Sequence, residues 1–271
     1  MEINKTINCS ILIPSCDAYA DLWEPFFTLF FKFWPDCPFK IFLGSNTLSY
    51  NDPRVTVLYS NHGKNWTNRT KEHLEMIETE YVLLCLEDFF MQSPISTPKI
   101  LSAFDVLKSV NGIVMRLTPR PAPDKRLKQY PEIGLIDSGA PFRVSTQTAI
   151  WKRESMISLM REGESIWEFE DRGSRRSDLL GDKFYGVWRP LMTYKHHVVE
   201  RGKWFRHEAE KFGSMNIGCD FTKRETMSRK EMFHFRMGKF IYYPFVNLPW
   251  KWRYFIEDSL RSLLGKKKRT I

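Results

Sequence analysis

Apolar and polar positions follow two alternating patterns over residues 7 to 118. Short runs rich in β-branched and aromatic residues, each closed by turn-forming or acidic residues, are typical of buried strands. Between these runs, apolar residues recur three or four positions apart, as they do along one face of a helix. The alternation predicts an α/β fold in which a mainly parallel sheet is flanked by helices. The strand-like runs are "SILIP", "FKIFLG", "RVTVLY", "YVLLCL" and "GIVMRL".

The pattern changes after residue 118. Residues 118 to 134 are rich in proline and basic residues and have no period, so they predict a long loop. The run "PFRVSTQTAIW" then predicts a strand, and a helix is expected over residues 153 to 161, before Gly163. In "ESIWEFED", Ser165 and Glu168 have the spacing of a capping box, which predicts that a second helix begins there.

Two adjacent acids, Glu87 and Asp88, follow the apolar run "YVLLCL". A sheet of this class binds ligands beyond the carboxyl ends of its strands. A divalent cation at that edge would offset the repulsion between the two carboxylates. The alternative is structural, with both side chains capping the next turn or pairing with lysine or arginine.

A second acidic group lies in the predicted helix after Ser165. Glu168 and Glu170 stand beside two aromatic residues, Trp167 and Phe169. Apolar neighbours can tune a carboxylate into a general base, although acids are also common at a helix start. Because the capping box would occupy Glu168, Glu170 is the first choice for a base.

The net charge of the chain is concentrated at one end. The formal charge is +9, and residues 222–271 carry all of it, since the acids and bases of residues 1–221 balance. We therefore expect a catalytic domain over 1–221 and a basic, aromatic extension over 222–271. Residues 250–264 have the stripe of an amphipathic helix, which suits either an anionic membrane surface or packing on the domain. No nucleic-acid-binding motif accompanies the basic residues, so we expect no nucleic acid partner.

Other sequence features argue against several kinds of site and segment. The five cysteines are scattered and lack a C-x-x-C pair, which argues against a zinc knuckle or a disulfide framework. The apolar segments are interrupted by charge or proline well before the roughly 20 residues that a membrane span needs. The first thirty residues lack the pattern of a secretory signal. We therefore expect a cytoplasmic protein, peripheral on the membrane if the basic extension docks there.

In the order of its segments the chain resembles the bacterial GT-A-type glycosyltransferases of surface polysaccharide and lipopolysaccharide biosynthesis. The resemblance covers roughly residues 7 to 204. It implies a GT-A-like (Rossmann-like) fold, a nucleotide-sugar donor, a glycan or lipid-linked acceptor, and Mg²⁺ or Mn²⁺ as cofactor. The segments that carry it are "SILIPSCDAYADLWEPF", "NWTNRTKEHLEMIETEYVLLCLEDFF", "FRVSTQTAIWKRESMISLMREGESIWEFE" and "VVERGKW".

The resemblance also implies roles for individual residues. Glu87 and Asp88 replace the acidic D-x-D motif of the family, with Asp88 preferred as the direct metal ligand because Phe89 stands where the second acid would be. A late histidine, His196 or His197, would be a further metal ligand, and at most one of the two would face the site. Glu170 or Glu168 would deprotonate the acceptor. The residues expected to line the donor nucleotide are Ser15, Asp17 and Tyr19.

Charge develops on the departing diphosphate during glycosyl transfer and needs cations nearby. Arg69, Arg201 and Lys203 are candidates for that role. We therefore predict a glycosyltransferase, inverting by virtue of the acids near Trp167. Two alternatives are a nucleotidyltransferase acting on sugar phosphates, for which "PSCDAY" lacks the expected glycines, and a non-catalytic sugar- or polyanion-binding protein.

Overall fold

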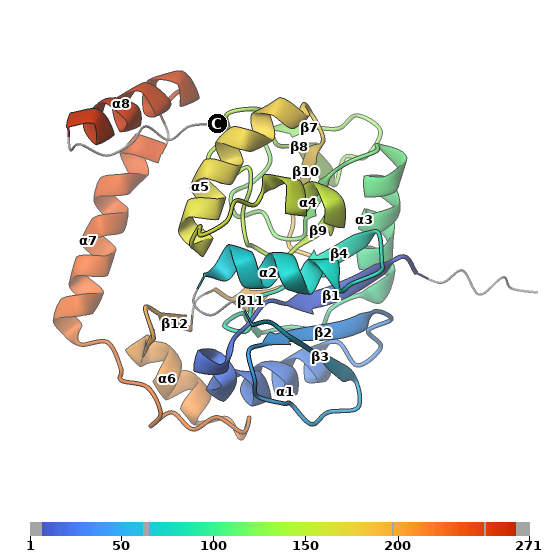
Figure 1. Cartoon of the computed structure of the whole chain (residues 1–271), viewed down its shortest axis with the longest axis vertical. Coiled ribbons are helices and arrows are strands. Elements are labelled where there is room, and N and C mark those ends of the chain that lie inside the picture. Colours follow the sequence, from blue (N-terminus) through green and yellow to red (C-terminus); the bar gives the residue numbers. More distant parts are fainter. Residues whose placement is uncertain (1–6, 62–64, 197, 247, 264–271) are drawn as a thin grey trace, which may run out of the picture.

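The computed structural model describes residues 7–61, 65–196, 198–246 and 248–263. Within these residues, nine strands form one sheet in the order β3-β2-β1-β4-β9-β6-β10-β8-β7 (Figure 1). Neighbours from β3 to β4 are parallel, whereas β9 and β8 run against the strands on either side of them. The predicted α/β fold with a mainly parallel sheet is therefore confirmed. The bounds are β1 Cys9–Ile13, β2 Lys40–Ser45, β3 Val55–Tyr59, β4 Tyr81–Leu84, β6 Val114–Arg116, β7 Lys125–Arg126, β8 Ile133–Leu135, β9 Ala149–Lys152 and β10 Phe184–Val187.

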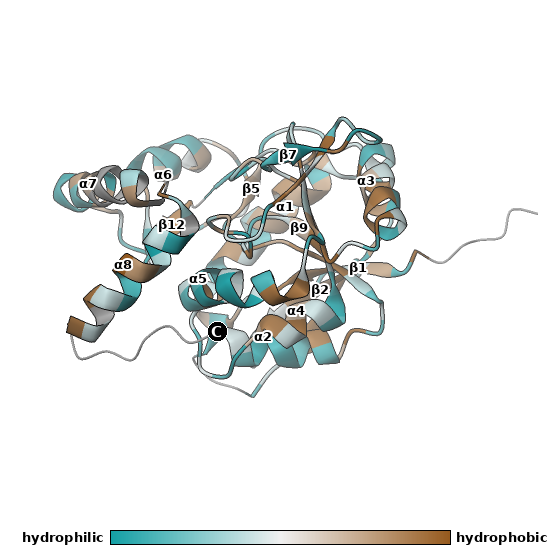
Figure 2. Ribbon diagram, turned by 90° about the horizontal axis from the view of Figure 1, so that it is seen from above, coloured by the Kyte–Doolittle hydropathy of each residue, from teal (hydrophilic) through white to brown (hydrophobic). Residues whose placement is uncertain are grey.

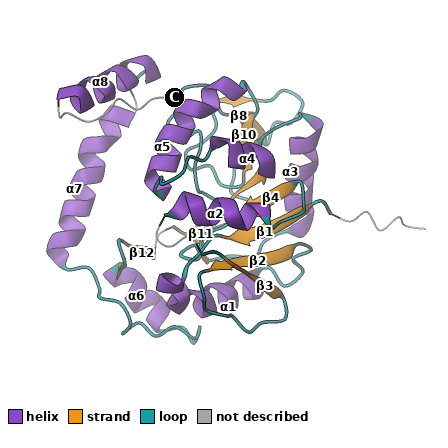
Figure 3. Ribbon diagram, viewed as in Figure 1, coloured by secondary structure: helices purple, strands orange, loops and turns teal. Residues whose placement is uncertain are grey.

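Helices cover both faces of the sheet (Figure 3). Successive residues of a strand point to opposite faces, so β1 contributes Ile11 and Ile13 to one apolar core and Leu12 to the other. The core around Ile11 includes side chains of α1 and α3, and the core around Leu12 includes side chains of α2, α4 and α5. The helices are α1 Trp23–Phe33, α2 Trp66–Glu75, α3 Thr97–Ser109, α4 Arg153–Leu159 and α5 Ile166–Ser177, with two 3₁₀ helices, η1 Asp17–Leu22 and η2 Asp178–Leu180.

Short strand pairs bring a late segment of the chain to the carboxyl end of β4. β5 (Phe90–Met91) pairs with β11 (Tyr194–Lys195), and β12 (Val199–Glu200) forms a hairpin with β13 (Lys203–Trp204). The backbone N–H of Val198 donates to the carbonyl of Asp88 at 3.4 Å. The segment that follows β10 therefore lies beside the two acids that follow β4.

Two predicted elements differ from the structure. The strand expected over "PFRVSTQTAIW" is formed only from Ala149 onward, because preceding backbone N–H groups bond to side chains instead of to a neighbouring strand. Val144 N donates to the Ser174 hydroxyl at 3.0 Å, and Thr146 N donates to Glu170 at 2.7 Å. The loop expected over residues 118 to 134 contains the short strand β7, which pairs with β8.

The remaining helices belong to the last quarter of the chain: α6 Arg206–Gly213, α7 Arg229–Val246 and α8 Trp250–Leu263. α8 confirms the helix predicted there. In the part of the chain that the structure describes, no helix combines the length and apolar character needed to cross a bilayer. The division of the chain at residue 221 stays a prediction, and Arg224 of the extension is bonded to Asp21 of the domain.

Candidate active site

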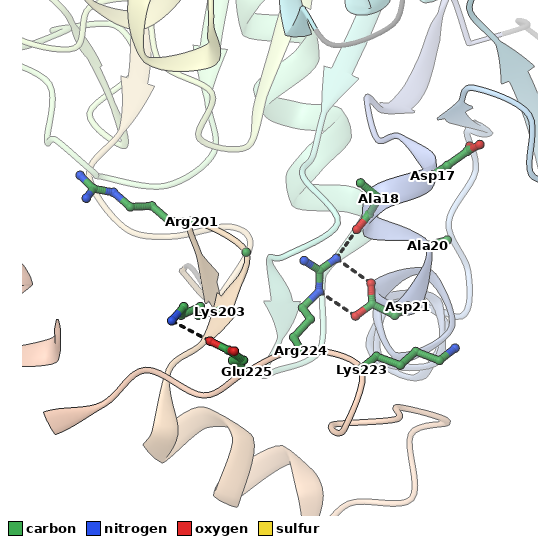
Figure 4. A pocket seen from close by; sticks show the side chains of 10 residues that line it. Asp17, Ala18, Ala20, Asp21, Arg201, Lys203, Lys223, Arg224 and Glu225 are labelled. Atoms are coloured by element: carbon green, nitrogen blue, oxygen red, sulfur yellow. Dashed lines mark hydrogen bonds and ion pairs between the residues drawn. The ribbon is translucent and has the colours of Figure 1, made fainter.

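An open pocket of about 590 Å³ lies where the carboxyl end of β1 leads into η1 (Figure 4). Residues of η1 form one side of it, the turn of the β12–β13 hairpin forms another, and the chain just before α7 forms a third. Its position is the edge at which sheets of this class bind ligands. The pocket is lined by Asp17, Ala18, Ala20, Asp21, Arg201, Gly202, Lys203, Lys223, Arg224 and Glu225.

Arg224 connects the pocket to the domain. Its guanidinium forms a bidentate pair with Asp21, at 2.7 and 2.6 Å, and also donates to the carbonyl of Ala18 (Figure 4). It lies 4.5 Å from the ring centroid of Tyr19. Burial alone would lower the pKa of Arg224, but the bonds with Asp21 outweigh it and raise the pKa. Arg224 is therefore a fixed positive charge at the pocket wall.

Lys203 and Arg201 approach the pocket from the hairpin. The ammonium of Lys203 lies 2.7 Å from Glu225 and 3.0 Å from Glu231, and these carboxylates raise the pKa of Lys203. Arg201 adopts a left-handed backbone conformation, with φ of 51°, at the turn of the hairpin. Lysine and arginine side chains come from two of the three walls, the hairpin and the chain before α7, and make the pocket suitable for an anionic ligand.

Asp17 also lines the pocket, but its carboxylate is directed to the loop after β2. It accepts hydrogen bonds from Ser45 Oγ at 2.8 Å, from Asn46 N at 2.9 Å and from Thr47 Oγ1 at 2.6 Å. Burial would raise the pKa of Asp17, but the hydrogen bonds from Thr47 and Ser45 outweigh it and hold the pKa below its usual range. Asp17 thus fixes the loop after β2 against the start of η1.

Glu87 is one of the two acids that follow β4, and its side chain is largely buried. The indole of Trp23 donates to Ser15 Oγ at 2.8 Å, so the Ser15 hydroxyl is left to donate its proton to Glu87. Burial, and after it the charge of Asp88, raises the pKa of Glu87 to about 7. A carboxyl group in this state would become more acidic if a cation bound beside it.

Two of the three residues predicted to line the donor nucleotide, Ser15 and Tyr19, lie near this acid, whereas Asp17 lines the open pocket. Burial first, and the charge of Glu87 second, raises the pKa of Tyr19 to about 12. Arg69 is buried on α2, and its charge acts on the thiol of Cys16, next to Ser15. Ser15, Tyr19, Arg69, Glu87 and Asp88 therefore surround the carboxyl end of β1, although none of them lines the open pocket.

The acids suit a hard divalent cation, which prefers oxygen ligands. Within the described ranges, no group of three or more His, Cys, Asp or Glu side chains is placed to hold a metal ion. His197 lies outside the described residues. Glu87 and Asp88 fit a cation by charge and by donor type, but the described residues place no third ligand of these kinds beside them.

A chain of hydrogen bonds ends at the ring of His196. Thr148 N donates to Tyr194 Oη at 3.2 Å, and Tyr194 then donates to Gln147 Oε1 at 3.0 Å. The amide nitrogen of Gln147 must consequently donate to His196 Nε2. This bond occupies Nε2 of His196. The His196 ring also packs against Phe89, at 5.4 Å between centroids.

The acids of α5 are engaged in structural contacts. Glu168 completes the predicted capping box, because its carboxylate accepts from Ser165 N at 3.0 Å and its own N–H donates to Ser165 Oγ. It also pairs with Arg172 at 2.8 Å. Glu170 Oε1 accepts from the backbone and the hydroxyl of Thr146 at 2.7 and 2.8 Å. Glu170 therefore holds the segment that carries Gln147.

The structure brings together residues that the sequence did not mark. Of the predicted residues, Asp17, Arg201 and Lys203 line the pocket, whereas Arg224 and Asp21 were not predicted at all. Asp21 and Arg224 are 203 positions apart, and no motif signals their pairing. A charge in the extension that folds back on η1 could be found only from the three-dimensional structure.

No protein-family model and no curated protein matches the chain. Solved structures with a similar arrangement include S. aureus TarS 1-349, at 14% identity and a TM-score of 0.47, with 69% of this chain and 59% of that chain covered. Another is glucosyl-3-phosphoglycerate synthase from Mycobacterium tuberculosis in complex with Mn²⁺ and UDP-glucose, at 9% identity and a TM-score of 0.42, with 70% and 71% covered.

A third similar structure is 2-C-methyl-D-erythritol 4-phosphate cytidylyltransferase from Thermus thermophilus. It is 12% identical, with a TM-score of 0.41, and the match covers 69% of this chain and 92% of that chain. This chain spans less than two thirds of the TarS fragment.

Proposed function

We propose that this chain is a glycosyltransferase that moves a sugar from a nucleotide donor to a polysaccharide or lipid-linked glycan, with inversion. The observation that carries the proposal is the surroundings of Tyr19, after the carboxyl end of β1. The Arg224 guanidinium lies 4.5 Å from its ring, and the charges of Glu87 and Asp88 add to the burial that raises the pKa of its phenol. Adjacent carboxylates and an arginine at this edge of an α/β sheet suit a diphosphate with a bound cation. The resemblance in segment order points to the same reaction.

Each part of the site has a proposed task. Arg224, Arg201, Lys203 and Lys223 attract the donor's diphosphate, and Arg224 stays charged throughout because Asp21 fixes it. Asp88, with Glu87, would hold Mg²⁺ or Mn²⁺, which when bound offsets negative charge on the departing diphosphate. Bringing a cation to this edge would also relieve the repulsion by Asp88, which after burial is the second cause of the raised pKa of Glu87.

Glu170 is the proposed base for the acceptor hydroxyl. Its Oε1 accepts the hydrogen bonds of Ser145 and Thr146, and among the described residues none donates to Oε2. An acceptor hydroxyl that approached Oε2 could therefore pass its proton to a carboxylate whose position is already fixed. Glu168 is the second choice, since its carboxylate serves the capping box and Arg172.

A thermal-shift screen tests the donor site. UDP, GDP, CDP and CMP are added to the full chain with and without Mn²⁺, because a ligand that binds only the folded state raises the melting temperature. We expect at least one nucleoside diphosphate to raise it, and to do so more strongly with Mn²⁺. If none of the four moves the transition at millimolar concentration, the donor site is wrong.

Turnover then separates the reaction from its alternatives. The nucleotide that gives the shift is supplied as its sugar conjugate, and release of nucleoside diphosphate is measured with and without glycan acceptors. A nucleotidyltransferase would instead release pyrophosphate from a nucleoside triphosphate and a sugar phosphate. A binding protein would show the thermal shift and no turnover with either pair of substrates.

A further inference from the structure

The charged side of α8 is turned toward the domain. Glu257 and Asp258 both accept from Arg175, a buried arginine on α5, at 2.6 and 3.0 Å. Arg253 of α8 is itself buried and donates to the carbonyl of Gly139 at 3.0 Å. The Arg175 guanidinium also lies 4.0 Å from the ring centroid of Tyr254. These contacts fix the rotation of α8 about its own axis.

The opposite side of α8 is apolar and exposed. Trp252, Phe255, Leu260 and Leu263 are 65, 66, 53 and 83% exposed. At 100° per residue they fall within one broad stripe, roughly opposite the side that meets Arg175. A helix that packs on a domain normally buries its apolar stripe and exposes its charges. Because α8 does the reverse, its apolar stripe lacks a cover within the described residues; Figure 2 shows hydrophobic and hydrophilic residues mixed along the ribbon of this helix.

Charge identifies the surface that would cover this stripe. The net charge of +9 comes from residues 222–271, and the sequence directly after α8 continues with Lys266, Lys267, Lys268 and Arg269. These four lie outside the described residues. Aromatic and leucine side chains beside clustered lysine and arginine are the composition of helices that lie in the headgroup region of anionic bilayers.

A second copy of the chain would fit less well. Joining two copies through this face would bring together two segments that each carry a net charge of +9, and their repulsion would oppose association. α8 has 14 residues, so it is about 21 Å long and too short to cross a hydrocarbon core of about 30 Å. A position flat on the bilayer surface satisfies its length, its apolar stripe and its charge together.

We propose that α8 docks on an anionic lipid bilayer through Trp252, Phe255, Leu260 and Leu263. The ion pairs of Arg175 with Glu257 and Asp258 hold the helix to the domain and keep the apolar stripe outward. The helix therefore needs no rearrangement to present its apolar side. Lysine and arginine that follow the helix add attraction to the acidic headgroups.

Vesicle co-sedimentation tests this docking. The full chain is mixed with vesicles that contain phosphatidylglycerol and with vesicles of phosphatidylcholine alone. The test variant is Trp252→Ser with Phe255→Ser, and the matched control is Tyr59→Ser with Met76→Ser, since these two side chains are also exposed but lie on the domain. All four substitutions are at exposed positions, so melting temperatures should stay close to that of the unchanged chain.

We expect the unchanged chain and the control variant to bind the anionic vesicles, and to bind phosphatidylcholine alone much more weakly. The Trp252→Ser, Phe255→Ser variant should partition about tenfold or more weakly, because two aromatic side chains no longer enter the interface. Raising the salt concentration should weaken binding of the unchanged chain.

Three outcomes would overturn the proposal. Equal vesicle binding by the test variant and the control would show that the stripe is not the contact. A concentration-dependent dimer that only the test variant loses, without lipid binding, would assign the face to a second copy. Binding of single-stranded RNA that the test variant loses, again without lipid binding, would assign it to nucleic acid.

Discussion

Glu87 and Glu170 each stand close to a second acid and to aromatic side chains, yet their surroundings differ. Glu170 accepts from Thr146 and Ser145, and its carboxylate is a structural anchor. Glu87 is more deeply buried, and Asp88 beside it helps to raise its pKa to about 7. A carboxylate that accepts hydrogen bonds from the surrounding fold, as Glu170 does, contributes to stability without a ligand. An acid that the fold buries beside a like charge costs stability until a proton or a cation arrives.

Asp88→Asn should have the largest effect on turnover. If Asp88 holds the metal ion, removing its charge should lower turnover by about 10³-fold, since a bound cation supplies several kcal/mol of charge stabilisation. Release of nucleoside diphosphate from the sugar conjugate measures it. Asp105→Asn, an exposed acid on α3, is the matched control and should keep full activity. Equal activities of the two variants would remove Asp88 from the site.

The pH dependence of stability should reveal the buried acid. An unfolded glutamate has a pKa of about 4.3, whereas that of Glu87 in the folded chain is about 7. The folded state therefore holds the proton more tightly, and this stability is complete below the lower pKa and is lost as the pH rises through the higher one. The loss amounts to about 4 kcal/mol.

Glu87→Gln is the variant that isolates this effect. The free energy of unfolding is measured with urea between pH 4 and pH 8 for both proteins. The value for the unchanged chain minus that for the variant should decrease as the pH rises. Other titrating groups are common to both proteins and cancel. A difference that stays constant over the whole range would mean that Glu87 titrates normally.

Glu170 should act on stability and on turnover through different atoms. Glu170→Ala removes the acceptor of the Thr146 and Ser145 hydrogen bonds and should cost about 2 kcal/mol in urea unfolding. Glu170→Gln keeps an oxygen for those bonds, so it should lose much less stability. If Glu170 is the base, Glu170→Gln should still lose turnover. Full turnover in this variant would leave Glu170 with a structural role alone.

Glu168→Ala should have the smallest effect. It removes half of the capping box at the start of α5 and its pair with Arg172, which together are worth about 1 kcal/mol. Turnover should stay near that of the unchanged chain. A large loss of turnover with an unchanged melting temperature would exchange the proposed roles of Glu168 and Glu170.

The sequence predicted those elements whose cause is local. The strand before Pro14 and the capping box at Ser165 depend on neighbouring residues, and both formed as predicted. The strand expected from residue 141 did not form before Ala149, because its N–H groups found side chains from α5, a contact that no local pattern encodes.

The candidate site likewise has parts that the local sequence predicts and parts that depend on contacts between distant segments. The acids after β4 were visible as a break in an apolar run, but the hydrogen bond from Ser15 to the buried Glu87 joins two segments that lie far apart in the sequence. The pairing of Arg224 with Asp21 joins the extension to η1 across most of the chain. Periodicity and spacing carry no information about contacts of this length.

Mn²⁺ binding to the unchanged chain and to Asp88→Asn tests the central claim most directly. Titration calorimetry in the presence of the nucleoside diphosphate that gives the thermal shift would be run in two buffers of different ionisation enthalpy, which counts released protons. The account predicts that Mn²⁺ binds the unchanged chain with release of about half a proton near pH 7, where about half of the Glu87 side chains are protonated, and binds Asp88→Asn far more weakly. Equal affinity in both proteins, without proton release, would contradict it.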